Sequence, residues 1–258
     1  MSYFDAIILG LVQGLTEFLP VSSSGHLVLV QELLHVDKAV ALDLDLVLHL
    51  GTLIAVLIYF RATVWRLIRS LFSSGAPEDR KMILWLVIGT IPAGVIGFLF
   101  QDYFEQAFGS PVSTSWELII TGAILLATRF FRPGNRHISF MPTVWMGIGQ
   151  AVAILPGISR SGTTIAAGLV AGVRPAMAAE FSFLLSIPVI AGAILLKGKE
   201  IANVSTGLLG PFLVGMLVSL VLGLLSVYIV LTTVKRGKFD YFAYYCFAVG
   251  ALGLYLFS

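Results

Sequence analysis

The chain has 258 residues, of which 58% are hydrophobic and only 12% are charged. Soluble domains carry about 25% charged residues, so this composition excludes a soluble globular protein and is typical of a polytopic membrane protein. The formal net charge of +2 is small, and the basic residues lie in short loops rather than on one face, so we expect no nucleic-acid partner. The single cysteine, Cys246, excludes an intrachain disulfide.

Six stretches of the chain are apolar and long enough to cross a membrane, which requires about 20 residues. They span residues 42–60, 82–101, 114–131, 178–196, 208–233 and 239–257. Two further regions, 4–35 and 143–173, each hold two shorter apolar pieces that a cluster of Pro, Ser and Gly interrupts. We expect an all-α membrane protein in which these regions form two re-entrant helix–loop–helix hairpins with polar tips that meet inside the membrane. The alternative is that each region is one kinked spanning helix.

The charged residues indicate how the spans are oriented. Twelve of the sixteen Lys and Arg fall in alternate connections: Arg61, Arg66, Arg69, Arg80, Lys81, Arg129, Arg132, Arg136, Arg174, Lys235, Arg236 and Lys238. The intervening connections carry Asp37, Asp43, Asp45, Asp102 and Glu105, with Lys38, Lys197 and Lys199 as exceptions. By the positive-inside rule the basic connections face the cytoplasm. Two hairpins that return to their starting side keep every basic connection there, whereas kinked spans do not, and both termini then lie outside.

An internal repeat appears when the chain is compared with itself at an offset of 137 residues. Gly10 matches Gly147, Gln13 matches Gln150, and SSSG at 22–25 matches SRSG at 159–162, although small residues also align by chance. Each copy holds one hairpin and three spans, and this odd number of crossings inverts the second copy. We therefore expect one integral membrane domain over residues 1–258, with repeat 1 at about 4–131, repeat 2 at about 143–257, and a binding site where the two repeats meet.

The second interrupted region contains the motif LPGISRSGTT, residues 155–164, with Arg160 at its centre. A guanidinium at membrane depth is costly unless it is paired, and its planar fork suits the oxygens of phosphate or carboxylate. We expect a helix to begin after Thr164, with free N–H groups that also favour an anion. In the alternative, Arg160 only pairs with Glu17 as a structural lock.

The first interrupted region contains the motif QGLTEFLPVSSSGH, residues 13–26. Glu17 lies four residues after Gln13, on the same helix face, and three serines precede Gly25 and His26. A carboxylate, an imidazole and several hydroxyls around an arginine form a plausible set for phosphoryl transfer, with an anion clamp, a nucleophile and an acid or base. The alternatives are that His26 is a satisfied buried residue and that the serines are helix caps, and we expect Ser22 or Ser24 to be one.

Five other polar residues rank lower as site candidates. His49 lies inside the first long span and is either a neighbour of the site or a core residue with its own hydrogen bond. Asp43, Asp45, Glu180 and Ser182 lie near the ends of spans, where solvation of the helix end accounts for them.

Together the two motifs resemble the signature motifs of the bacterial undecaprenyl pyrophosphate phosphatases of the bacitracin-resistance type, over essentially the whole chain. The resemblance implies hydrolysis of undecaprenyl diphosphate to the monophosphate, which regenerates the lipid carrier of cell-wall synthesis. It also implies dependence on a divalent cation, Mg²⁺ or Ca²⁺, and a multi-pass protein of the bacterial cytoplasmic membrane with an extracytoplasmic active site.

The resemblance also implies roles for individual residues. By position, the implied catalytic residues are Glu17, Ser23, His26 and Arg160, and Glu17 is the implied metal contact. The implied substrate-binding residues are Gln13, Ser22, Ser24, Gly25, Ser159, Ser161, Gly162, Thr163 and Thr164. The family's first motif begins with Glu or Gln, and here Gln13 cannot act as a base or give a metal an anionic ligand. We favour Ser23 as the nucleophile with His26 as its base, and attack by His26 itself is the alternative.

The expected partners are a polyprenyl diphosphate lipid and membrane lipids, and the sequence allows a homodimer. A membrane transporter or lipid flippase is the alternative function, because inverted repeats are common in transporters. Phosphate release from a prenyl diphosphate in detergent, where no leaflets exist, distinguishes an enzyme from a transporter.

Overall fold

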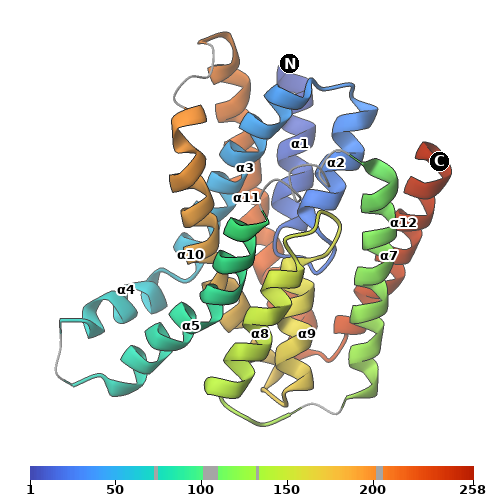
Figure 1. Ribbon diagram of the computed structural model, residues 1–258. Coiled ribbons are helices and arrows are strands. Elements are labelled where there is room, and N and C mark those ends of the chain that lie inside the picture. The colour runs from blue at the N-terminus through green and yellow to red at the C-terminus, as the bar shows by residue number, and fades with distance from the viewer. Residues whose placement is uncertain (73–74, 101–109, 132–133, 202–205) are drawn as a thin grey trace.

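The computed structural model describes residues 1–258 except 73–74, 101–109, 132–133 and 202–205, and the described residues form helices without a β-strand (Figure 1). The α-helices are α1 (Tyr3–Thr16), α2 (Ser23–Leu33), α3 (Lys38–Tyr59), α4 (Arg61–Ser70), α5 (Pro77–Leu99), α7 (Pro111–Ala127), α8 (Phe140–Val152), α9 (Arg160–Val170), α10 (Pro175–Ile201), α11 (Thr206–Lys235) and α12 (Phe242–Phe257). Two short 3₁₀ helices, Thr128–Phe130 and Phe239–Tyr241, follow α7 and precede α12.

Six helical stretches among the described residues are long and apolar enough to cross a membrane, which confirms the six predicted spans. They are Lys38–Tyr59, Pro77–Leu99, Pro111–Phe130, Pro175–Leu196, Gly207–Lys235 and Phe239–Phe257. Several begin a few residues before the predicted start, at Pro77 rather than 82 and at Pro111 rather than 114. Proline is favoured in the first turn of a helix, where its missing N–H has no intrahelical partner to lose. The chain is thus built as a multi-pass membrane protein.

Four of the remaining helices are too short to span, and they form two antiparallel pairs. Helices α1 and α2 have 14 and 11 residues, and α8 and α9 have 13 and 11. At 1.5 Å per residue even α1 reaches only about 21 Å, against about 30 Å of hydrocarbon. The α1–α2 pair begins at one end of the molecule and the α8–α9 pair at the other, so that their turns meet in the middle (Figure 1). The backbone N–H of Gly157 in the second turn donates to Ser22 Oγ in the first, at 3.2 Å.

Close helix packing surrounds the two turns. Helix α11 contacts both α1 and α3, α12 contacts α7, and α5 contacts α8. Gly10 of α1 faces Gly215 of α11 so closely that a Cβ atom at Gly10 would lie 3.1 Å from the Gly215 Cα. Small residues at such contacts let helix backbones approach in a membrane protein. Beside the first turn, Phe18 and Phe183 form an edge-to-face pair in the core, with ring centroids 5.4 Å apart.

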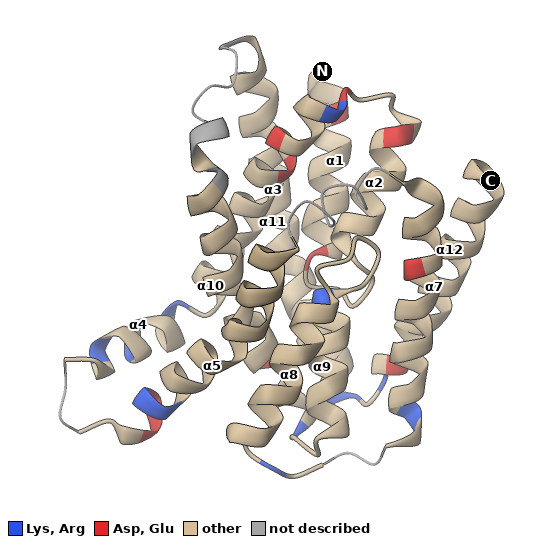
Figure 2. Ribbon diagram, viewed as in Figure 1, with Lys and Arg blue, Asp and Glu red and all other residues tan. Residues whose placement is uncertain are grey.

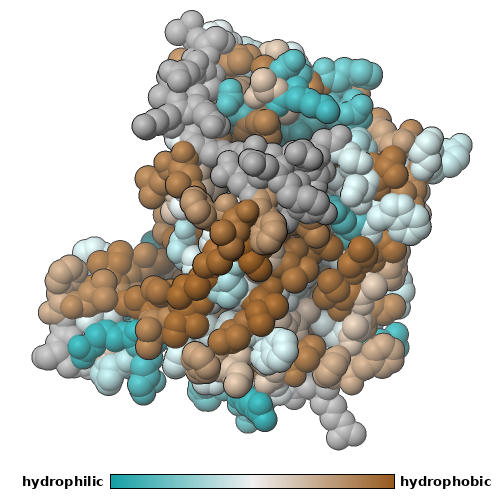
Figure 3. All heavy atoms as spheres, viewed as in Figure 1, coloured by the Kyte–Doolittle hydropathy of each residue, from teal (hydrophilic) through white to brown (hydrophobic). Residues whose placement is uncertain are grey.

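Charge and hydropathy follow the pattern that the sequence predicts. Most Lys and Arg lie at the end of the molecule where α4 joins α5 and where α7 ends (Figure 2). Apolar side chains cover the middle of the face shown in Figure 3. Three of the charged residues used in the orientation argument, Asp102, Glu105 and Arg132, lie outside the described residues.

Candidate active site

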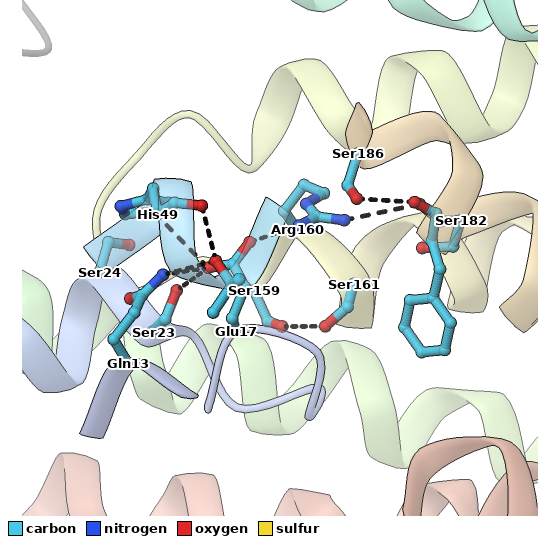
Figure 4. A network of polar contacts seen from close by, with 12 residues as sticks. Gln13, Glu17, Ser23, Ser24, His49, Ser159, Arg160, Ser161, Ser182 and Ser186 are labelled. Carbon is cyan, nitrogen blue, oxygen red and sulfur yellow. Dashed lines mark hydrogen bonds and ion pairs between the residues drawn. The ribbon is translucent and has the colours of Figure 1, made fainter. Parts of the chain in front are cut away.

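Glu17 is the centre of a buried polar cluster at the end of α1 (Figure 4). Its carboxylate Oε1 accepts a hydrogen bond from the Nη2 atom of Arg160 at 2.5 Å, within an ion pair. Its Oε2 accepts from Ser23 Oγ at 2.6 Å and from Gln13 Nε2 at 3.0 Å. The Glu17 side chain is only 6% exposed. A buried carboxylate is stable when donors surround it as they do here, so one acidic group gathers residues from three helices.

Arg160 is the first residue of α9, and Ser159 caps that helix by accepting from the Gly162 N–H. The prediction that the helix begins after Thr164 is therefore wrong, because the serine at 159 is already an N-cap. The early start directs the guanidinium toward Glu17, while Nη1 reaches the Ser182 carbonyl oxygen at the weak distance of 3.5 Å. The fork retains hydrogen-bonding capacity for an added anion.

The turn before α2 is built around Ser22, which confirms that one of the two serines is the helix cap. Its Oγ accepts from the N–H groups of Gly25 at 3.3 Å and Gly157 at 3.2 Å. Ser22 has a φ of 67°, a conformation that a residue with a Cβ adopts at a cost. A Cβ at Gly25 would lie 2.9 Å from the Gly157 Cα, so this glycine permits the two turns to touch.

His26 lies outside the Glu17 cluster, although the sequence predicts it as the base for Ser23. Its Nδ1 is 2.7 Å from the Ser22 carbonyl oxygen, and its Nε2 is 2.9 Å from the Tyr245 hydroxyl. Both ring nitrogens therefore contact protein groups other than Ser23. The hydroxyl of Ser23 instead donates to Glu17, so the geometry favours Glu17 as the group that takes its proton.

The hydroxyls that the sequence assigns to the substrate mostly bond to the protein. Ser161 Oγ donates to the Leu19 carbonyl at 2.9 Å, which ties the second turn to the first. Thr163 Oγ1 donates to the Gly149 carbonyl at 2.9 Å, and Thr164 Oγ1 contacts Ser182 Oγ at 2.5 Å. Ser24 Oγ lies 3.3 Å from Ser22 Oγ. Of these residues only Ser161 links the two turns, while Thr163 and Thr164 bond to α8 and α10. Their contact with substrate remains a prediction.

Two acidic or basic residues outside the two motifs lie next to the site. His49 of α3 places Nε2 3.5 Å from Glu17 Oε2 and is 29% exposed, so it is a neighbour of the cluster. Glu117 of α7 is buried beside Gly157, and its Oε2 has no hydrogen-bond partner among the described residues. Glu117 was missed, yet Thr114, Glu117 and Thr121 form a polar stripe at helical spacing on an apolar span, which is a recognised functional signal.

The described residues do not fit a resident divalent cation. They contain no group of three or more His, Cys, Asp or Glu side chains that could hold a metal ion. Both oxygens of Glu17 already accept hydrogen bonds, and the neighbouring Gln13 supplies only a neutral oxygen, which is buried and unpaired among the described residues. Mg²⁺ and Ca²⁺ prefer six or more oxygen ligands, several of them anionic, so the side chains around Glu17 alone would bind these ions weakly.

Comparison with known proteins confirms the family that the two motifs resemble. The family model described as "Bacitracin resistance protein BacA" matches residues 6–252. A protein of Methanobrevibacter smithii named "Undecaprenyl-diphosphatase" is 42% identical, over 98% of this chain and 96% of its own length. Proteins with that name from Salinibacter ruber and, as "Undecaprenyl-diphosphatase 1", from Shouchella clausii are each 40% identical, over 99% and 98% of this chain and 100% and 95% of their own lengths. The chain therefore belongs to the BacA family of bacitracin resistance proteins.

Proposed function

We propose that this protein is a hydrolase that converts undecaprenyl diphosphate to undecaprenyl phosphate and inorganic phosphate, and so recycles the lipid carrier of cell-wall synthesis. The observation that carries the proposal is the bridging position of Glu17, which binds an arginine through one oxygen and a serine hydroxyl through the other. An anion clamp, a nucleophile and its base are thus adjacent in one buried cluster. The names of the relatives support the same substrate and reaction.

In the proposed mechanism, Arg160 and the N–H groups at the starts of α2 and α9 bind the diphosphate and offset the charge that develops on the terminal phosphoryl group. Ser23 Oγ attacks that phosphorus while Glu17 Oε2 accepts its proton, which the 2.6 Å hydrogen bond supports. The bond to the bridging oxygen breaks, and the lipid monophosphate leaves. Water then attacks the phosphoserine, the bond between phosphorus and Ser23 Oγ breaks, Glu17 returns its proton to Oγ, and inorganic phosphate leaves. Attack by His26 is the alternative, and it requires Nε2, which carries the lone pair, to lose the hydrogen bond from the Tyr245 hydroxyl.

The proposal includes Mg²⁺ or Ca²⁺ only as an ion that the diphosphate oxygens and water bring to the site. No step above depends on the ion, because the described residues do not form a cage for it. Isothermal titration of the substrate-free protein should therefore show no tight Mg²⁺ or Ca²⁺ site.

We further propose that the two short helix pairs are re-entrant hairpins within an inverted repeat. Adding 137 to the bounds of α2, 23 and 33, gives 160 and 170, which are the bounds of α9. Adding 137 to those of α1, 3 and 16, gives 140 and 153, against 140 and 152 in α8. The opposite directions of the pairs support inversion, and the positive-inside rule assigns the α1–α2 pair to the extracytoplasmic side of a bacterial cytoplasmic membrane.

We assign the prenyl tail of the substrate to an apolar groove beside the turn between α1 and α2. An apolar groove of about 600 Å³ is lined by residues of α1, α12 and the turn between α1 and α2, among them Leu15, Leu19 and Phe242. His26 forms part of its wall, so the groove reaches the turn that carries Ser23. Burial of the tail among such side chains would supply much of the binding free energy, because apolar burial contributes about 0.8 kcal/mol per CH₂.

Phosphate release from undecaprenyl diphosphate by the purified protein in detergent tests the proposal. We expect catalytic release by the wild-type chain and loss of release in Glu17→Gln. Absence of release by a folded wild-type protein would contradict the enzyme proposal and leave the transporter or flippase alternative, which the names of the relatives do not favour.

A further inference from the structure

The imidazole of His26 has a defined tautomer that two neighbours set. A carbonyl oxygen only accepts hydrogen bonds, so the 2.7 Å contact with Ser22 O requires the proton on Nδ1. In the neutral ring Nε2 then carries a lone pair, and the Tyr245 hydroxyl, 2.9 Å away, donates to it. The two rings are also stacked, with centroids 5.5 Å apart and planes 6° from parallel. The Ser22 carbonyl thereby fixes the proton on Nδ1, and Tyr245 of α12 holds the ring in place through Nε2.

The same histidine stabilises the strained turn that carries Ser23. Ser22 has a φ of 67°, and its carbonyl oxygen accepts from both the backbone N–H and the Nδ1–H of His26, at 3.2 and 2.7 Å. Backbone strain of this kind persists only where surrounding contacts determine it. The residue after Ser22 is Ser23, whose hydroxyl meets Glu17 at 2.6 Å. The direction of the Ser23 hydroxyl therefore depends on the conformation that His26 holds.

We infer that Tyr245 is a positioning residue for the reaction, which acts through His26 and the Ser22 carbonyl to hold Ser23 against Glu17. This inference rests on the proposed function and adds a residue of α12 to the site. Without the Tyr245 hydroxyl, Nε2 loses its partner, and the ring of His26 is free to rotate away from the Ser22 carbonyl. The turn would then lose the Nδ1–H hydrogen bond, one of the contacts that stabilise it.

Tyr245→Phe tests this route, because it keeps the stacked ring and removes only the hydroxyl. The matched control is Tyr244→Phe, one residue away on the same helix and 55% exposed. For Tyr245→Phe we expect the kcat for phosphate release in detergent to fall by about tenfold or more, with KM changed by less than about threefold, since small misplacements of reacting groups can cost about 10²-fold in rate. Tyr244→Phe should match the wild type.

Nitrogen NMR of the ¹⁵N-histidine-labelled protein supplies a readout that a general loss of packing would not change in the same way. The wild type should show His26 as the Nδ1–H tautomer, assigned by comparison with His26→Asn. Tyr245→Phe should show faster exchange of the Nδ1 proton with solvent, because the ring is no longer held against the Ser22 carbonyl. Wild-type kcat in Tyr245→Phe, or unchanged exchange of that proton alongside a fall in kcat, would overturn the inference.

His26→Asn separates positioning from direct chemistry. The Asn amide nitrogen occupies about the place of Nδ1 and can still donate to the Ser22 carbonyl, but the side chain has no group at the place of Nε2. If His26 only holds the turn that carries Ser23, His26→Asn keeps more activity than His26→Leu. Adding Tyr245→Phe to His26→Asn then causes no further loss of activity. Equal inactivity of both His26 variants would overturn the inference. Inactive wild-type protein would refute the proposed function, while exchange of the Nδ1 proton in Tyr245→Phe would still report on the contact.

Discussion

Replacing Arg160 with lysine distinguishes a catalytic clamp from a structural lock. In the structure Arg160 Nη2 binds Glu17 at 2.5 Å and Nη1 makes only a marginal contact with the Ser182 carbonyl at 3.5 Å. Lysine retains the charge opposite Glu17, so we expect the free energy of unfolding to change by only about 1 kcal/mol. Arg160→Ala leaves the buried carboxylate uncompensated and should cost about 3–5 kcal/mol.

The effect of Arg160→Lys on rate should be much larger than its effect on stability. A lysine that binds Glu17 has no second arm for the phosphoryl oxygens, and removing one preorganised donor of this kind lowers kcat by about 10²–10³-fold. Phosphate release in detergent and thermal unfolding of the same preparation measure the two quantities. A folded Arg160→Lys protein with wild-type kcat would refute the clamp and establish the lock.

Three further predictions follow from the contacts around the turns. Ser23→Ala should lower kcat by about 10³-fold or more because the nucleophile is lost. Ser24→Ala should change kcat by less than about fivefold, because among the described residues the hydrogen bond of Ser24 Oγ is to the neighbouring Ser22 hydroxyl, and equal losses would argue against Ser23 as the nucleophile. Gly157→Ala should lower the free energy of unfolding by roughly 1–3 kcal/mol, since Gly157 has a φ of +102° and a Cβ there would lie 2.6 Å from the Glu117 Cβ. An unchanged temperature of thermal unfolding would contradict this contact. In equilibrium dialysis the protein should retain Ca²⁺ when a prenyl diphosphate is present but not when it is free of substrate. Tight retention without substrate would contradict the conclusion that the described residues do not fit a resident divalent cation.

The sequence predicts the membrane architecture well because its signal is local. Twenty-residue apolar stretches identify the six spans, and clusters of Pro, Ser and Gly mark the two turns. The pairing of Glu17 with Arg160, 143 residues apart, could also be predicted from the sequence. A carboxylate and a guanidinium that are both buried within the membrane stabilise each other. Helix starts were less accurate where Ser159 or Pro77 initiates the helix early.

The direction of side chains within the site depends on contacts that no local pattern contains. His26 was predicted beside Ser23, but the carbonyl of Ser22 and the hydroxyl of Tyr245, 219 residues away, hold its ring elsewhere. His49 approaches Glu17 because α3 lies against α1, and motif spacing gives no indication of that contact. Glu117 lies outside the two motifs, on α7, and its polar stripe with Thr114 and Thr121 is the sequence signal that indicates it.

Trapping the covalent intermediate tests the central claim most directly. The purified protein is mixed with undecaprenyl diphosphate radiolabelled in its terminal phosphate and quenched in denaturing detergent at neutral pH within the first turnover. Half of the sample is then treated with acid, and the labelled peptide in each half is identified. Attack by Ser23 with Glu17 as its base predicts an acid-stable label on Ser23 that is absent from Ser23→Ala and Glu17→Gln. An acid-labile label on His26, or a label that persists in Ser23→Ala, would contradict the account.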